Sequence, residues 1–126
     1  MIVLDTSALV FWTLDPAQLS ERAKQVIEET EQINISSISV WEIALKVKRG
    51  KLAIPLTIDD YVERLNQLDR LKITAVDVQN WLDNLNLSWE HRDPADRTIV
   101  ALAARLGCPL LTSDSRIAEF YEETVW

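Results

Sequence analysis

Cysteine, histidine and long apolar runs are scarce in this chain. The 126 residues include one cysteine, Cys108, and one histidine, His91. A single cysteine excludes an intramolecular disulfide and a cysteine metal cluster, and it favours a reducing environment. No apolar run approaches the ~18 residues of a membrane span, and residues 1–5 lack the basic and apolar regions of a signal peptide. We therefore expect a soluble, cytoplasmic protein without a membrane segment.

Basic residues are outnumbered, but they are not evenly spread. The 20 acids and 13 bases give a formal net charge of -7, which at first argues against a nucleic-acid partner. The distribution changes this interpretation, because no acid lies between Glu42 and Asp59. A group of bases falls in that interval: Lys46, Lys48, Arg49 and Lys51. The sequence thus predicts a positive patch beside an acid, and bound divalent cations would further reduce the negative potential.

Short apolar runs alternate with helical patterns along the whole chain. Strands are expected at residues 2–4, 33–36, 73–76, 109–112 and 124–126. Helices are expected at residues 6–12, 20–31, 39–49, 77–86 and 94–106, with further helical stretches after Thr57 and Ser115 and a loop at 87–92. There is no repeat, low-complexity stretch or linker. This order predicts an α/β fold in one domain, residues 1–126, with a mainly parallel central sheet flanked by helices.

The helix at residues 94–106 has the clearest signals. Asp93 can cap it, Pro94 occupies the first helical position, and Gly107 ends it. Apolar residues recur at helical spacing and predict its core face. These residues are Ile99, Leu102, Ala103 and Leu106.

Four acids lie at predicted strand-to-helix junctions: Asp5, Glu42, Asp96 and Asp114. In parallel sheets, ligands bind outside the carboxyl ends of the strands, where Asp5 and Asp114 are expected. Carboxylates about 4 Å apart repel by roughly 4 kcal/mol at an effective dielectric of 20, so such a cluster calls for a cation or raised pKa values. Oxygen ligands without Cys or clustered His favour Mg²⁺ or Mn²⁺ over Zn²⁺.

Each acid also has a purely structural explanation. Asp5 and Asp114 can cap the helices that follow them, and Asp96 is favourable in a first helical turn. Ser39 and Glu42 form a capping-box pattern, and Glu42 can instead pair with Lys46. Capping alone does not explain why all four acids lie at junctions that a parallel sheet would place along one edge. The joint pattern therefore predicts a metal site.

Three segments together resemble the PIN-domain nucleases, specifically the VapC-like toxins of prokaryotic toxin–antitoxin systems. They are MIVLDTSALVFW, SSISVWEIALKVKRGKL and HRDPADRTIVALAARLGCPLLTSD, in this order across nearly the whole chain. The resemblance implies a PIN-like fold with catalytic, metal-binding acids at Asp5, Glu42, Asp96 and Asp114. It further implies an accessory acid at Asp93 and polar positions beside the metal at Thr6 and Ser113.

The implied reaction is hydrolysis of RNA phosphodiester bonds assisted by Mg²⁺ or Mn²⁺. The bases that we expect to hold the RNA backbone are Lys46, Arg49, Arg97 and Arg116, with Lys48 and Lys51 as further candidates. His91 is interpreted as a loop residue, since the metal mechanism needs no histidine. The five tryptophans are interpreted as core or interface residues, with Trp89 as a candidate for stacking on an unpaired base.

The resemblance also implies partners, namely a cognate antitoxin and a second copy of the chain in a homodimer. Residues 19–49, with their apolar helical faces, are the expected antitoxin surface. Two other functions stay open at this stage. One is a PIN-fold binding module that engages an antitoxin or RNA without cleavage. The other is phosphotransfer with Asp5 as nucleophile, which Ser7 disfavours because such enzymes normally carry a second Asp at that position.

Overall fold

The computed structural model describes all 126 residues and contains five strands in one sheet. The strands are β1 (Ile2–Leu4), β2 (Ile33–Ser36), β3 (Leu71–Thr74), β4 (Leu110–Leu111) and β5 (Thr124–Val125). Their order is β3-β2-β1-β4-β5, and every neighbouring pair is parallel. The predicted α/β fold is confirmed, and the sheet is wholly rather than mainly parallel.

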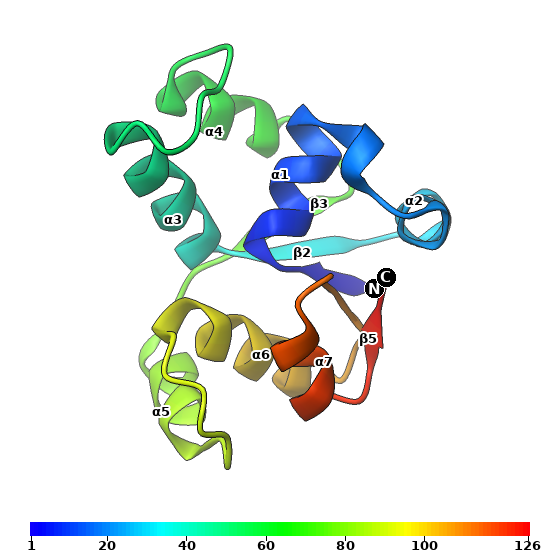
Figure 1. Ribbon diagram of the computed structural model, residues 1–126, viewed down its shortest axis with the longest axis vertical. Coiled ribbons are helices and arrows are strands. Elements are labelled where there is room, and N and C mark those ends of the chain that lie inside the picture. The colour runs from blue at the N-terminus through cyan, green and yellow to red at the C-terminus, as the bar shows by residue number, and fades with distance from the viewer.

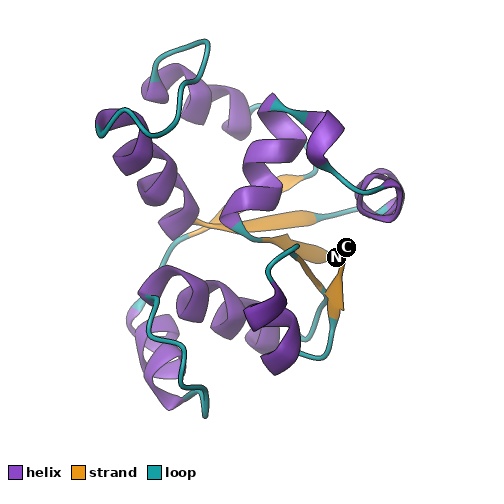
Figure 2. Ribbon diagram, in the orientation of Figure 1, coloured by secondary structure: helices purple, strands orange, loops and turns teal.

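Helices cover both faces of this sheet (Figures 1 and 2). In chain order they are α1 (Thr6–Leu14), the short 3₁₀ helix η1 (Pro16–Gln18), α2 (Glu21–Glu29), α3 (Ser37–Lys48), α4 (Ile58–Asn66), α5 (Val78–Asn86), α6 (Pro94–Leu106) and α7 (Ser115–Phe120). Figure 1 shows α1 to α4 on one side of the strands and α5 to α7 on the other. No helix is both long and apolar enough to cross a membrane.

Alternating side chains of the central strand β1 supply both halves of the core. Ile2 and Leu4 pack in one cluster with residues of α1, α2, α3 and α4. Val3 points the other way and packs with Ile99 of α6 and Ile117 of α7. All three β1 residues are buried, as expected for a parallel strand covered on both faces. This packing fixes the register in which β1 lies between β2 and β4.

Several expected element boundaries are wrong by a few residues. Helix α3 begins at Ser37 rather than Ser39, because the Ser36 hydroxyl caps it directly after β2 by accepting the N–H of Ile38 at 3.2 Å. Strand β3 covers residues 71–74 rather than 73–76, the stretch that pairs with β2. Leu106 is 36 % exposed, so it does not belong to the core face of α6; it is the last residue of that helix.

Candidate metal centre

Two of the predicted acids follow neighbouring strands at the carboxyl edge of the sheet. Asp5 comes directly after β1, and Asp114 comes shortly after β4, which pairs with β1. The Asp5 carboxylate accepts the N–H of Ala8 at 2.8 Å, and the Asp114 carboxylate accepts the N–H of Arg116 at 2.9 Å. Both acids therefore cap helices, as the structural explanation predicts. The same caps hold both carboxylates at the edge where parallel sheets bind ligands.

The hydroxyl of Thr112 connects these two acids. It donates a hydrogen bond to the Asp5 carboxylate and accepts the backbone N–H of Asp114 at 3.0 Å. Ser113, which the resemblance places beside the metal, is exposed and makes no side-chain hydrogen bond. The sequence offered a usable signal for Thr112, because it is the first residue after β4 and so lies beside Asp5, the first residue after β1.

The first turn of α6 carries Asp93 and Asp96. Asp93 caps the helix by accepting the N–H of Asp96 at 2.9 Å. The Asp96 carboxylate lies 2.7 Å from Nε2 of His91, a residue that we interpreted only as part of a loop. One ligand atom from each of His91, Asp93 and Asp96 lies within 4.8 Å of the other two. The structure thus adds His91 to the candidate site, which no spacing rule in the sequence had indicated.

Glu42 reaches the site from α3 and is held by α1. The hydroxyl of Thr6 donates to the Glu42 carboxylate and is also 2.9 Å from the hydroxyl of Ser39. The expected capping box is therefore wrong, because Ser39 is buried inside the helix. Glu42 also makes no ion pair with Lys46. Thr6 therefore supports Glu42 by this hydrogen bond.

Burial and mutual repulsion raise the pKa of three of these carboxylates. Desolvation raises the pKa of Asp5 from 3.8 to about 6, with smaller contributions from the charges of Asp96 and Asp114. Desolvation also raises the pKa of Asp96, and the charges of Asp93 and Asp114 add to this effect. The pKa of Glu42 is raised by desolvation and by the charges of Asp93 and Asp96. The charge of Asp96 thus acts on both Asp5 and Glu42, and the charge of Asp114 acts on both Asp5 and Asp96.

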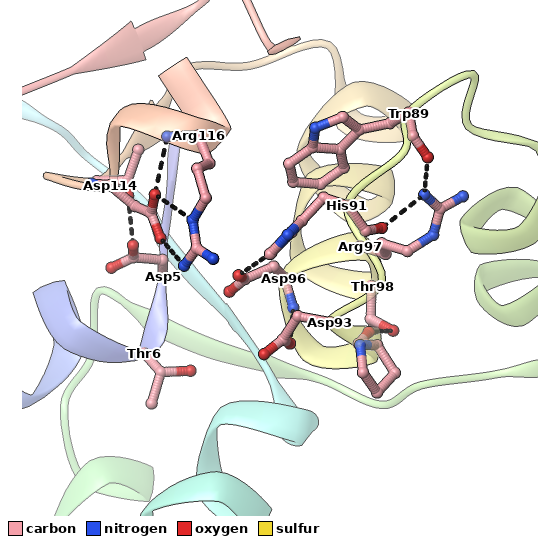
Figure 3. A network of polar contacts seen from close by, with 12 residues as sticks. Asp5, Thr6, Trp89, His91, Asp93, Asp96, Arg97, Thr98, Asp114 and Arg116 are labelled. Carbon is pink, nitrogen blue, oxygen red and sulfur yellow. Dashed lines mark hydrogen bonds and ion pairs between the residues drawn. The ribbon is translucent and has the colours of Figure 1, made fainter. Parts of the chain in front are cut away.

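Arg116 forms an ion pair with one acid of this cluster, Asp114. Figure 3 shows its side chain beside Asp114, with Asp5 close by and Asp93 and Asp96 across the site. Its Nε and Nη2 atoms donate to Asp114 at 3.4 and 3.2 Å. Desolvation raises the pKa of Asp114, but the hydrogen bonds and charge of Arg116 outweigh it and leave that pKa below its usual value.

Arg97 has a different role from the one that we expected. Its guanidinium donates to the backbone carbonyls of Asn84, Leu87, Trp89 and His91 and to the side-chain carbonyl of Asn84. These contacts use all five N–H groups that an arginine offers. No donor is left for a phosphate, so Arg97 instead holds the loop between α5 and α6. That loop places His91 within hydrogen-bonding distance of Asp96.

The bases of α3 lie on the other side of Glu42. A small hollow of about 160 Å³ is lined by Trp41, Glu42, Leu45, Lys46, Arg49 and Lys51. Trp41 is 60 % exposed there, so it is a surface residue rather than part of the core. The predicted positive patch therefore adjoins the acid cluster.

The donor set fits a divalent cation. Asp5, Glu42, Asp96 and Asp114 offer carboxylate oxygens, and three of them have pKa values raised by desolvation and by one another. A bound cation would relieve this repulsion, and hard oxygen ligands suit Mg²⁺ or Mn²⁺. The single histidine beside these carboxylates, His91, does not change the preference for Mg²⁺ or Mn²⁺.

Comparisons with known proteins show the family of this chain. The family model of the PIN domain matches residues 2–123. Ribonuclease VapC22 of Mycobacterium tuberculosis is 27 % identical over 128 residues, covering 99 % of this chain and 98 % of that protein.

Solved structures with the same fold include a toxin–antitoxin complex from Klebsiella pneumoniae, with a TM-score of 0.70 and 19 % identity. The match covers 100 % of this chain and 97 % of the chain in that complex. VapC20 of Mycobacterium tuberculosis, a toxin that cleaves the sarcin–ricin loop, has a TM-score of 0.67, 14 % identity and coverage of 94 % of each chain. From the family match along nearly its whole length, the chain belongs to the PIN domain family, and its relatives include VapC toxins.

Proposed function

We propose that this chain is a metal-dependent endoribonuclease that acts as the toxin of a toxin–antitoxin pair. The observation that carries the proposal is that Asp5 and Asp114 follow the paired strands β1 and β4, and that the charge of Asp96 on α6 acts on both Asp5 and Glu42. Desolvation raises the pKa of Asp5, Glu42 and Asp96. The similarity to ribonuclease VapC22 supports RNA as the substrate. These acids would hold Mg²⁺ or Mn²⁺, which would polarise the phosphate and lower the pKa of a bound water.

The surrounding side chains position the carboxylates for this task. Thr112 orients Asp5, Thr6 orients Glu42, and His91 orients Asp96. Supporting hydrogen bonds of this kind fix the direction of metal ligands and tune their basicity. Asp93 would serve as an accessory acid, because its charge acts on both Glu42 and Asp96.

The RNA backbone would approach along the basic side of the site. Lys46 and Arg49 line the hollow that includes Glu42, so phosphates bound there would lie next to the acid cluster. Arg116 would contact the phosphate from the opposite side once a metal ion neutralises the acids that it now faces. Electrostatic attraction of this kind is independent of RNA sequence and weakens with salt.

We expected the antitoxin to bind residues 19–49. Many apolar side chains of that segment are buried in the core, including Leu19, Ala23 and Ile27, so we propose another surface. An apolar groove of about 400 Å³ lies instead between α1 and α4. Trp12 and Leu14 line one side, and Leu56, Leu65 and Leu68 contribute to the rest. Such a groove suits the apolar face of an antitoxin helix.

The homodimer that we expected would form through the exposed face of α5. This helix leaves Val78 and Leu85 75 % exposed, Leu82 48 % and Trp81 44 %. Contiguous apolar residues at a protein surface mark interaction sites, and interface cores are enriched in tryptophan. A second copy of the chain is therefore proposed to cover α5.

Cleavage of total cellular RNA by the purified chain tests the proposed activity. We expect discrete fragments with Mg²⁺ or Mn²⁺, none with EDTA, and none from Asp96→Asn, which loses a proposed metal ligand. Asp59→Asn is the matched control, because Asp59 also lies in the first turn of a helix but is exposed, on α4. Folded, metal-loaded wild type that binds RNA or antitoxin without cutting any RNA would instead identify a binding module.

A further inference from the structure

A second hollow adjoins the acid cluster at His91 and Arg116. It has a volume of about 410 Å³ and is lined by Trp89, Glu90, His91, Arg116, Glu119 and Phe120. This volume lies within the roughly 300–1,000 Å³ of typical small-ligand sites. Two of its lining residues also touch the cluster, because His91 contacts Asp96 and Arg116 contacts Asp114. Whatever occupies the hollow therefore lies next to the proposed cleavage site.

One wall of the hollow is a fixed set of aromatic rings. Trp89 stacks on Phe120 with ring centroids 4.8 Å apart and an interplanar angle of 9°, and His91 lies 4.7 Å from Trp89. Arg97 holds the backbone of this wall by donating to the carbonyls of Trp89 and His91 at 2.6 and 3.1 Å. Unpaired bases commonly bind against aromatic side chains, so this wall suits a nucleobase.

The polar groups of the hollow indicate which base would fit. Glu90 and Glu119 are both exposed, and neither makes an ion pair. Ionised carboxylates only accept hydrogen bonds and repel phosphates, so they select an uncharged group with N–H donors. Among the four RNA bases, guanine alone presents two adjacent N–H donors on its Watson–Crick edge, which match the two oxygens of one carboxylate.

We propose that this hollow binds one unpaired guanine of the RNA, adjacent to the phosphate at the acid cluster. The inference rests on the proposed function, since it takes the ligand to be RNA. The aromatic rings would contact the base, and the carboxylate of Glu119 or Glu90 would accept its N1–H and 2-amino hydrogen bonds. Arg116 would contact the neighbouring phosphate from the rim. The chain would thus cut single-stranded RNA next to guanine.

A binding experiment separates this inference from the nuclease activity. Short oligouridylates with one central guanosine, inosine or adenosine are titrated with the full chain in EDTA, and fluorescence anisotropy gives Kd. We expect guanosine to bind at least tenfold more tightly than adenosine, with inosine intermediate because it lacks the 2-amino group. The double variant Glu90→Gln/Glu119→Gln should reduce the guanosine preference to below threefold, whereas Glu63→Gln, on α4, should leave it unchanged.

Mapping of cut sites in Mg²⁺ completes the test. Cleavage beside guanine that spreads to other bases in the double variant would support the proposal. Cleavage without a guanine preference, or a preference that the double variant retains, would overturn the guanine site and leave the nuclease intact. A guanosine preference in binding without any cleavage would overturn the nuclease and leave the guanine site standing.

Discussion

Single residues at this site have structural and chemical roles at the same time. Asp5 accepts the N–H that caps α1 and a hydrogen bond from Thr112, and only 6 % of its surface is exposed. These contacts hold the carboxylate in place, but they do not fully compensate for its burial, because its pKa stays near 6. The capping explanation and the metal explanation of Asp5 are therefore compatible rather than alternatives.

Asp5→Asn is expected to stabilise the metal-free chain at neutral pH. The folded pKa of Asp5 is about 6 and its ordinary value is 3.8, so ionisation disfavours the folded state progressively as the pH rises from about 4 to 6. Above pH 6 this cost is constant, and removing it should raise the free energy of unfolding by about 1–3 kcal/mol. Urea unfolding in EDTA at pH 7.5 and pH 4 measures the effect, which should nearly vanish at pH 4.

The same variant should respond differently to metal. Mg²⁺ should raise the urea midpoint of the wild type, because binding to the folded state alone stabilises it. Asp5→Asn should gain much less from Mg²⁺, since it lacks one proposed ligand. A variant that is equally stabilised by Mg²⁺, or less stable than wild type in EDTA at pH 7.5, would contradict this account of Asp5.

Arg97→Ala is expected to destabilise the chain by about 2–4 kcal/mol, because several hydrogen bonds from a charged group are lost together and water replaces part of them. The partly buried carbonyls of Asn84 and Leu87 would lose their arginine donor. Arg97→Lys should recover only part of the loss, because an ammonium cannot reproduce the fork of the guanidinium. Urea unfolding measures both variants. Arg105→Ala, which removes only an exposed 3.5 Å pair with Asp77, should cost far less.

At the scale of elements, the sequence predicted which helices and strands exist better than where they end. The Asp93 cap and the Gly107 end were predictable because the signals that begin and end α6 are local. The start of α3 was not, because three serines in residues 36–39 can each cap a helix and tertiary packing selects Ser36. The roles of His91 and Arg97 depend on how the loop at 87–92 folds back, and no periodic pattern encodes that.

The end of α6 gives a direct test of a predicted helix stop. Gly107 has a φ of 61°, in the left-handed region, and a Cβ atom there would meet nothing within 4 Å. Gly107→Ala should therefore cost about 1 kcal/mol through backbone conformation alone. Gly107→Asn should cost less, because asparagine tolerates this region. Thermal or urea unfolding of both variants checks the order, and a larger loss for Asn would contradict it.

At the scale of the whole molecule, the exposed face of α5 predicts self-association. Leu85→Glu places a charge in the exposed apolar set and should shift the chain from dimer to monomer in sedimentation velocity. Gln32→Glu adds the same charge at an exposed position outside α5 and should leave the dimer intact. A wild type that is monomeric at micromolar concentration would contradict the proposed dimer through α5.

The acids of the site come from distant parts of the chain, since Asp5 follows the first strand and Asp114 follows the fourth. Ribosomes synthesise proteins from the N-terminus at roughly 5–20 residues per second, so Asp114 is added about 5–20 s after Asp5. A nascent chain that has not yet reached Asp114 lacks one of the four proposed ligands. Synthesis order alone therefore delays the assembly of the complete acid site until this domain has almost been translated.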